Sequence, residues 1–291
     1  MPGPSLIPVL IRELVSERTL PREPEPDLVM TNEEQVKSYA HAGRIDGVMS
    51  SAYLYHSARV SQVMRGCKEV VDLGCGPATQ LIQIAELNPE ISFHGIDLSD
   101  TMLDRAREYA QERKVSNVRF SKCDITKLDL LGDASADGVM TTMVLHHLPT
   151  REHLRSCFRE IARILRPNGA VYLTDFGRLK SLKSVIYFAY INAKHQPHLF
   201  TLDYERSLRA AFTVDDFRQV AAETLPAHVS LYTTFMVPML TVLKTEDKPL
   251  APETIKRLKE LRGALPAKYR ADLDQIRSFF RMGKMPNDPF R

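Results

Sequence analysis

A short apolar segment that ends in a glycine-rich loop is the feature that most constrains the fold. Residues 69–73 read as a buried strand, and Gly74-Cys75-Gly76 ends it. Glycine lets the backbone turn tightly and approach a ligand with no Cβ in the way. The apolar periodicity of residues 78–87 predicts a helix immediately afterwards. This strand–loop–helix unit indicates a parallel α/β sheet with a ligand at the loop.

Strand and helix patterns alternate beyond this unit. Strands are predicted at residues 91–96, 118–121, 138–142 and 170–174, with helices at 99–113 and 150–165. A long helical segment at 177–211 interrupts the alternation, and a helix at 213–224 and strands at 228–234 and 239–244 follow. The pattern predicts an α/β fold whose mostly parallel sheet carries helices on both faces.

A carboxylate at the end of the second predicted strand points to a nucleoside ligand. Asp97 lies where Rossmann-like sites bind both ribose hydroxyls. A dinucleotide and S-adenosylmethionine (SAM) compete for such a site. A dinucleotide loop reads G-x-G-x-x-G and places the pyrophosphate at a helix N-terminus. This chain instead reads G-x-G-x-A, with Pro77 inside the turn and Ala78 at its end.

Five stretches resemble, in order, the motifs of class I (Rossmann-like) SAM-dependent methyltransferases. Residues 72–78 resemble the acid-x-G-x-G-x-G motif, with Ala78 in place of the third glycine, which we expect to alter slightly how the next helix packs. The others are residues 95–99, 122–125, 136–149 and 165–169. The resemblance covers about residues 65–245. It implies a Rossmann-like seven-stranded sheet, SAM as cofactor, S-adenosylhomocysteine as product and the small-molecule branch of the family.

The resemblance also implies which residues bind SAM. Asp72 would lie near its amino group, Asp97 at the ribose, and Asp124 at the adenine amino group. Each has an ordinary alternative: a turn cap, a helix N-terminal acid and a loop carboxylate, respectively. The predicted cofactor-binding residues are Asp72, Gly74, Gly76, Asp97, Leu98, Met102, Asp124, Ile125 and Met143.

Two adjacent histidines stand in the fourth motif, which lines the methyl-transfer side. His147 matches the place where methyltransferases resembling the phosphoethanolamine enzymes carry a catalytic histidine, and His146 precedes it. An unperturbed histidine, with a pKa near 6.5, suits the removal of a proton from a hydroxyl or ammonium nucleophile. The alternative is that these residues only begin the following helix. Tyr39 is the second predicted catalytic residue.

The same patterns divide the chain into six segments. The SAM-binding Rossmann-like core would span residues 67–176 and end at 212–245. The other four are a proline-rich N-terminal arm (1–30), a helical cap (31–66), a helical lid insertion (177–211) and a C-terminal helical extension (246–291). We expect the cap and the lid to build the acceptor site, and the core to fold without residues 1–30.

Composition and charge exclude several classes of partner. The 39 Lys and Arg residues exceed the 36 Asp and Glu residues by only 3, too few for a nucleic-acid reader. The four cysteines show no metal-ligand spacing, so no metal and no disulfide are predicted. No apolar run is long enough for a membrane span, which favours a cytoplasmic protein. The sequence leaves open whether the chain forms a homo-oligomer.

A small metabolite is the expected acceptor, methylated on an O, N or S atom. S-methylation of a thioether amino acid such as methionine is the minor alternative within this class. Two further alternatives keep the cofactor but not the reaction: a SAM-binding enzyme that does not methylate, and a SAM-binding regulatory subunit. All of them need the same cofactor residues, so the sequence does not separate them.

Overall fold

The computed structural model describes residues 6–26 and 47–291. Its seven-stranded sheet has the order β3-β2-β1-β4-β5-β7-β6, and β7 alone runs antiparallel to its neighbours. The strands are β1 (Glu69–Leu73), β2 (Ser92–Asp97), β3 (Val118–Lys122), β4 (Ala136–Thr142), β5 (Leu165–Phe176), β6 (Ser230–Thr233) and β7 (Leu240–Lys244). The predicted Rossmann-like, mostly parallel sheet is confirmed.

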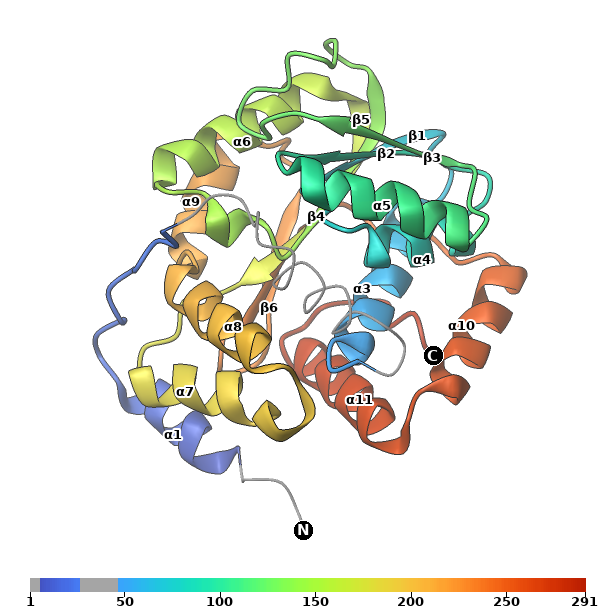
Figure 1. The fold of residues 1–291 in the computed structure, drawn as a ribbon. Helices are drawn as coiled ribbons and strands as arrows, with labels where there is room; N and C mark the ends of the chain where they lie inside the picture. The colour runs from blue at the N-terminus through green and yellow to red at the C-terminus, as the bar shows by residue number, and fades with distance from the viewer. Residues whose placement is uncertain (1–5, 27–46) are drawn as a thin grey trace.

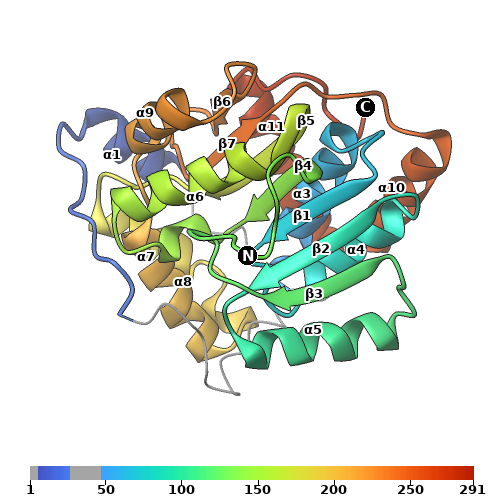
Figure 2. The ribbon, with the colours of Figure 1, turned by 90° about the horizontal axis from the view of Figure 1, so that it is seen from above.

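Helices cover both faces of this sheet, because successive strand residues point to opposite sides. Val70 and Tyr172 belong to one apolar cluster, whereas their neighbours Val71 and Val171 belong to the other. The first cluster includes residues of α3 (Ser50–Val63), α4 (Thr79–Leu87), α5 (Asp100–Glu112), α10 (Pro252–Ala264) and α11 (Ala267–Met282). The second includes residues of α6 (Arg151–Ile164) and α9 (Val214–Thr224). Figures 1 and 2 show this layered arrangement.

The C-terminal extension forms the two helices that its sequence predicts, and both pack onto α3. Tyr55 of α3 stacks on Phe280 of α11 with ring centroids 5.3 Å apart. The described part of the 31–66 segment is mainly α3, which is almost completely buried. Tyr39, the second predicted catalytic residue, lies outside the described residues.

Strand β5 begins earlier than the sequence predicts. The pattern places it at residues 170–174, but Leu165 already pairs with Ala136 of β4. The register shifts before Gly138 pairs with Ala170, and Asn168 in the shifted segment has a positive φ of 61°. The stretch at residues 165–169, which resembles the last of the five motifs, is therefore an irregular start of the strand.

Among the described residues, no helix has the length and apolar character to cross a bilayer.

Three helices, one from the N-terminal arm and two from the predicted lid, lie together at the side of the sheet where β4 ends (Figure 2). α7 (Leu182–Tyr190) and α8 (His198–Ala210) come from the segment predicted as a lid, and α1 (Ile7–Val15) packs on α7. Helix α8 contacts η1 (Leu145–His147), the short 3-10 turn that follows β4. Glu13 of α1 is 1% exposed and accepts a hydrogen bond of 2.9 Å from the Lys180 backbone N–H. The described part of the arm, residues 6–26, is thus docked on the rest of the chain.

Candidate functional site

The loop after β1 brings the backbone of two neighbouring strand ends together. Gly74 has φ 74°, and a Cβ there would lie 2.4 Å from the Val144 side chain. Gly76 has φ 53°, but a Cβ there would meet nothing within 4 Å. Gly74 is therefore needed for close packing, whereas Gly76 faces open space. The Asp97 carboxylate accepts hydrogen bonds from the backbone N–H groups of Gly76, at 2.8 Å, and Ser99, at 2.9 Å.

Two non-glycine residues near this loop adopt a left-handed backbone. Ala78, which replaces the third glycine of the motif, has φ 57° and is fully buried at the start of α4. Met143, directly after β4, also has φ 57°. An L-residue is less stable than glycine in this region of backbone space. The departure from the glycine motif thus raises the backbone energy of the turn, and its effect on the packing of α4 stays a prediction.

Asp72, near the end of β1, is a buried carboxyl that a positively charged ligand group could pair with. Its side chain is buried, and its Oδ1 has no hydrogen-bond partner among the described residues. Burial, and secondarily the nearby charge of Asp97, raises the pKa of Asp72 to about 8. A buried carboxyl without a donor is costly. An ammonium group placed here would restore its charge, so the site fits the amino group of SAM.

The remaining predicted cofactor residues lie at the same end of the sheet. Leu98 is 39% exposed after β2, whereas Met102 in α5 is buried. Asp124 is exposed after β3, and its Oδ1 accepts bonds from the backbone N–H and hydroxyl of Thr126, at 2.7 and 2.8 Å. Ile125 is half-buried against the cluster that contains α6. The carboxyl ends of β1, β2, β3 and β4 thus present all the predicted cofactor residues.

Replacing Asp72 with asparagine is expected to stabilise the ligand-free protein by an amount that grows from pH 4 to pH 8. The folded pKa of Asp72 is raised, so its folded form holds a proton that the unfolded chain releases above about pH 4. Stability is therefore lost as pH rises towards 8 in the wild type but not in Asp72→Asn. Melting temperatures of both proteins measure this difference. Asp100→Asn, on the surface, is the control, and a pH-independent difference would contradict the assignment.

The two histidines of the fourth motif lie in η1, and each pairs with a carboxylate. His146 is buried, and its Nδ1 lies 2.7 Å from Oδ1 of Asp175 near the end of β5. The backbone N–H of His146 also donates to Oδ2 of Asp175, at 2.9 Å. Burial alone would lower the pKa of His146, but the charge and hydrogen bond of Asp175 outweigh it and raise this pKa.

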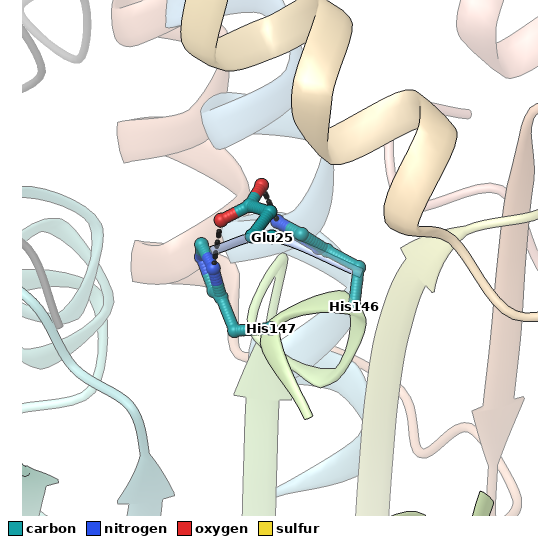
Figure 3. A group of neighbouring side chains, drawn as sticks. All are labelled: Glu25, His146 and His147. Atoms are coloured by element: carbon teal, nitrogen blue, oxygen red, sulfur yellow. Dashed lines mark hydrogen bonds and ion pairs between the residues drawn. The ribbon is translucent and has the colours of Figure 1, made fainter. Parts of the chain in front are cut away.

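The partner of His147 comes from the N-terminal arm (Figure 3). Nδ1 of His147 lies 2.6 Å from Oε2 of Glu25, and the Ser207 hydroxyl donates to Oε1 of Glu25 at 2.8 Å. The same Oε1 is 4.0 Å from Nε2 of His146. Burial would raise the pKa of Glu25, but the hydrogen bond and charge of His147, with smaller effects of His146 and Ser207, lower it to about 2.

Arg22 fastens this part of the arm over η1. Its guanidinium donates to the carbonyls of His146, at 3.0 Å, and Leu148, at 2.6 Å, and to that of Pro149. Its Nε donates to the Ala210 carbonyl at 2.7 Å, at the end of α8. The arm is therefore tied to both the turn after β4 and the helices of the predicted lid.

Sequence reasoning found the histidines but not their carboxylates. Asp175 is the penultimate residue of β5, and its place at the carboxyl edge of the sheet is a signal that could have been used. Glu25 had no such signal in the sequence, because it stands in a proline-rich stretch that is typical of an extended linker.

Comparison with known proteins identifies the segment that carries this site. Residues 64–196 match a family described as a methyltransferase domain. The chain is 35% identical over 114 residues to the 27-O-demethylrifamycin SV methyltransferase of Amycolatopsis mediterranei, covering 39% of this chain and 40% of that protein. It is 34% identical over 109 residues to phosphoethanolamine N-methyltransferase 2 of Caenorhabditis elegans, covering 38% and 24%.

A third relative and a solved structure complete the comparison. The tRNA (guanine-N(7)-)-methyltransferase of Chloroherpeton thalassium is 36% identical over 70 residues, covering 24% of this chain and 31% of that protein. The alignments thus cover less than half of each of these relatives. A SAM-dependent methyltransferase structure from Aquifex aeolicus matches with a TM-score of 0.51 at 14% identity, covering 73% of this chain and 97% of that one. At this identity the structural match shows the fold alone.

Proposed function

We propose that this chain, which carries a class I SAM-dependent methyltransferase domain, moves the methyl group of SAM to an oxygen or nitrogen atom of a small metabolite. The observation that supports this most directly is the pair formed by His147 and Glu25 at the end of β4. Such a base can deprotonate a hydroxyl or ammonium nucleophile, whereas a thioether has no proton to lose. Methylation of a thioether, as in methionine, is the alternative within this class.

The cofactor end of the site is assigned to residues at the ends of β1 and β2. Asp72 would hold the amino group of SAM, because one oxygen of its buried carboxyl has no hydrogen-bond partner in the part of the chain that the structure describes. Asp97, already ordered by two backbone N–H groups, would accept hydrogen bonds from the ribose hydroxyls. Bound SAM supplies a sulfonium methyl group for in-line displacement, with S-adenosylhomocysteine as the leaving group.

The acceptor end is assigned to His147. Its Nδ1–H donates to Glu25, so the lone pair on Nε2 is left to accept a proton. The protein would place the acceptor atom in line with the methyl group, where a fixed geometry contributes much of the rate. Nε2 of His147 would take the proton that the acceptor atom loses on methylation. Tyr39 is kept as a second candidate.

The relatives are named for different methyl acceptors, so the proposed substrate class rests on the charge composition of this chain. Two are named for small molecules, and the third for tRNA. The near balance of basic and acidic residues favours a small molecule over RNA, which proteins bind mainly through clustered cations. The four cysteines are unpaired, as is usual for cytoplasmic proteins, and the cytoplasm is the proposed location.

A melting curve with S-adenosylhomocysteine, and with NAD as the control, is the test of the cofactor. A ligand at 100 times its dissociation constant should add about 2.7 kcal/mol of stability. A rise with S-adenosylhomocysteine alone is expected, and a rise with NAD alone would overturn the proposal. Metabolite pools are then screened for acceptor-dependent release of S-adenosylhomocysteine. A regulatory SAM-binding subunit would show the melting shift without any such release.

A further inference from the structure

We infer that Glu25, on the N-terminal arm, is a positioning residue that holds His147 in the tautomer and orientation needed to deprotonate the acceptor. The inference rests on the proposed function, because it assigns the mechanism by which the base is prepared. It makes the segment that carries Arg22 and Glu25 a part of the active site. The matched methyltransferase segment begins only at residue 64, so this part of the site lies outside it.

The geometry of the pair determines which nitrogen of His147 is available. Nδ1 lies 2.6 Å from Oε2 of Glu25, so one hydrogen bond joins the two atoms. The pKa of Glu25 is lowered to about 2, so Glu25 is ionised near neutral pH and only accepts this bond. Nδ1 must therefore carry the hydrogen, and Nε2 is left with its lone pair. Without the carboxylate, either nitrogen could carry it.

Glu25 is itself held in place from several directions. Its side chain is 11% exposed, and Ser207 of α8 donates to its other oxygen. Arg22 anchors the same stretch through carbonyls on η1 and at the end of α8. Glu23, between them, points outward to an ion pair with Arg209 at 2.8 Å. On this stretch of the arm, the carboxylate of Glu25 therefore faces the histidines, whereas that of Glu23 lies at the surface.

The charges around the pair are already balanced. Two carboxylates, Asp175 and Glu25, face the guanidinium of Arg22 and the ring of His146, whose raised pKa favours its protonated form. The possible ligand atoms of Glu25, His146 and His147 lie within 4.8 Å of one another, close enough to hold a metal ion. A divalent cation would have to replace the 2.6 Å hydrogen bond and leave the cluster with excess positive charge. The observations therefore favour the hydrogen-bonded pair.

Replacing Glu25 with glutamine in the full chain tests this inference. We expect kcat to fall about 10- to 100-fold, while the KM for SAM and the melting shift with S-adenosylhomocysteine stay within twofold of wild type. The dependence of kcat on pH should also change, because Glu25 would no longer place a negative charge beside the ring of His147. Glu25→Asp should recover part of the rate. Glu23→Gln, on the same arm, is the matched control and should leave all of these values unchanged.

A second readout does not depend on the acceptor. Nitrogen-15 NMR of the histidines should show His147 as the Nδ1–H tautomer in the wild type, and as a mixture in Glu25→Ala. The His147→Gln spectrum identifies the signal. An unchanged tautomer and an unchanged pH profile would overturn the inference, even where S-adenosylhomocysteine still stabilises the protein. A stoichiometric metal ion that is lost in Glu25→Gln would also overturn it, in favour of a metal site.

Discussion

Replacing His147 with alanine is expected to lower kcat by about 100-fold or more, while the affinity for S-adenosylhomocysteine changes less than threefold. The size follows from the usual contribution of a positioned general base. The selectivity is expected because the cofactor is assigned to the carboxylates of Asp72 and Asp97, at the ends of β1 and β2, whereas His147 lies in η1, after β4. Steady-state kinetics between pH 6 and pH 9 and calorimetry with S-adenosylhomocysteine measure the two quantities.

His153→Ala is the control for this variant. His153 lies six positions further on in α6, and its ring bonds to the Thr150 hydroxyl on the surface. Its loss should leave kcat unchanged. Normal turnover of His147→Ala across the pH range would return His147 to a structural role at the helix start. The double variant with Glu25→Gln should be little slower than His147→Ala alone, because a residue that only orients the base has no effect once the base is gone.

Replacing Asp97 with alanine is expected to weaken SAM binding at least tenfold. Two losses add in the same direction. The ribose hydroxyls would lose a charged acceptor, and the backbone N–H groups of Gly76 and Ser99 would lose the oxygens that hold them at 2.8 and 2.9 Å. The glycine loop would then have to be ordered by the ligand itself. Isothermal calorimetry with SAM and with S-adenosylhomocysteine gives the two affinities.

Asp100→Ala separates this effect from a general loss of negative charge. Asp100 begins α5, three positions from Asp97, and is paired with Lys122 on the surface. We expect its replacement to change SAM affinity less than twofold, as exposed ion pairs contribute little. An Asp97→Ala protein that melts like the wild type and binds SAM with wild-type affinity would remove Asp97 from the cofactor site.

The sequence by itself determined the sheet and the cofactor loop, because both depend on short-range patterns. Val70 and Val71 point to opposite faces of β1, so a short apolar run already implies helices on both sides. Gly74, Gly76 and Asp97 belong to adjacent strand ends of one βαβ unit, whose spacing brings them together. The start of β5 was less predictable, because a register shift there lets a turn-like stretch pair.

Only the tertiary structure decided how the histidines are partnered. His147 and Glu25 are 122 positions apart, and no periodicity in the sequence relates them. Their contact depends on where α1 and the following stretch dock: Glu13 on the Lys180 backbone, and Arg22 on the carbonyls of η1 and α8. Such contacts use ordinary side chains and backbone groups, which leave no signature in a single sequence. Local spacing fixes which backbone elements form, whereas the catalytic pairing arises from long-range packing.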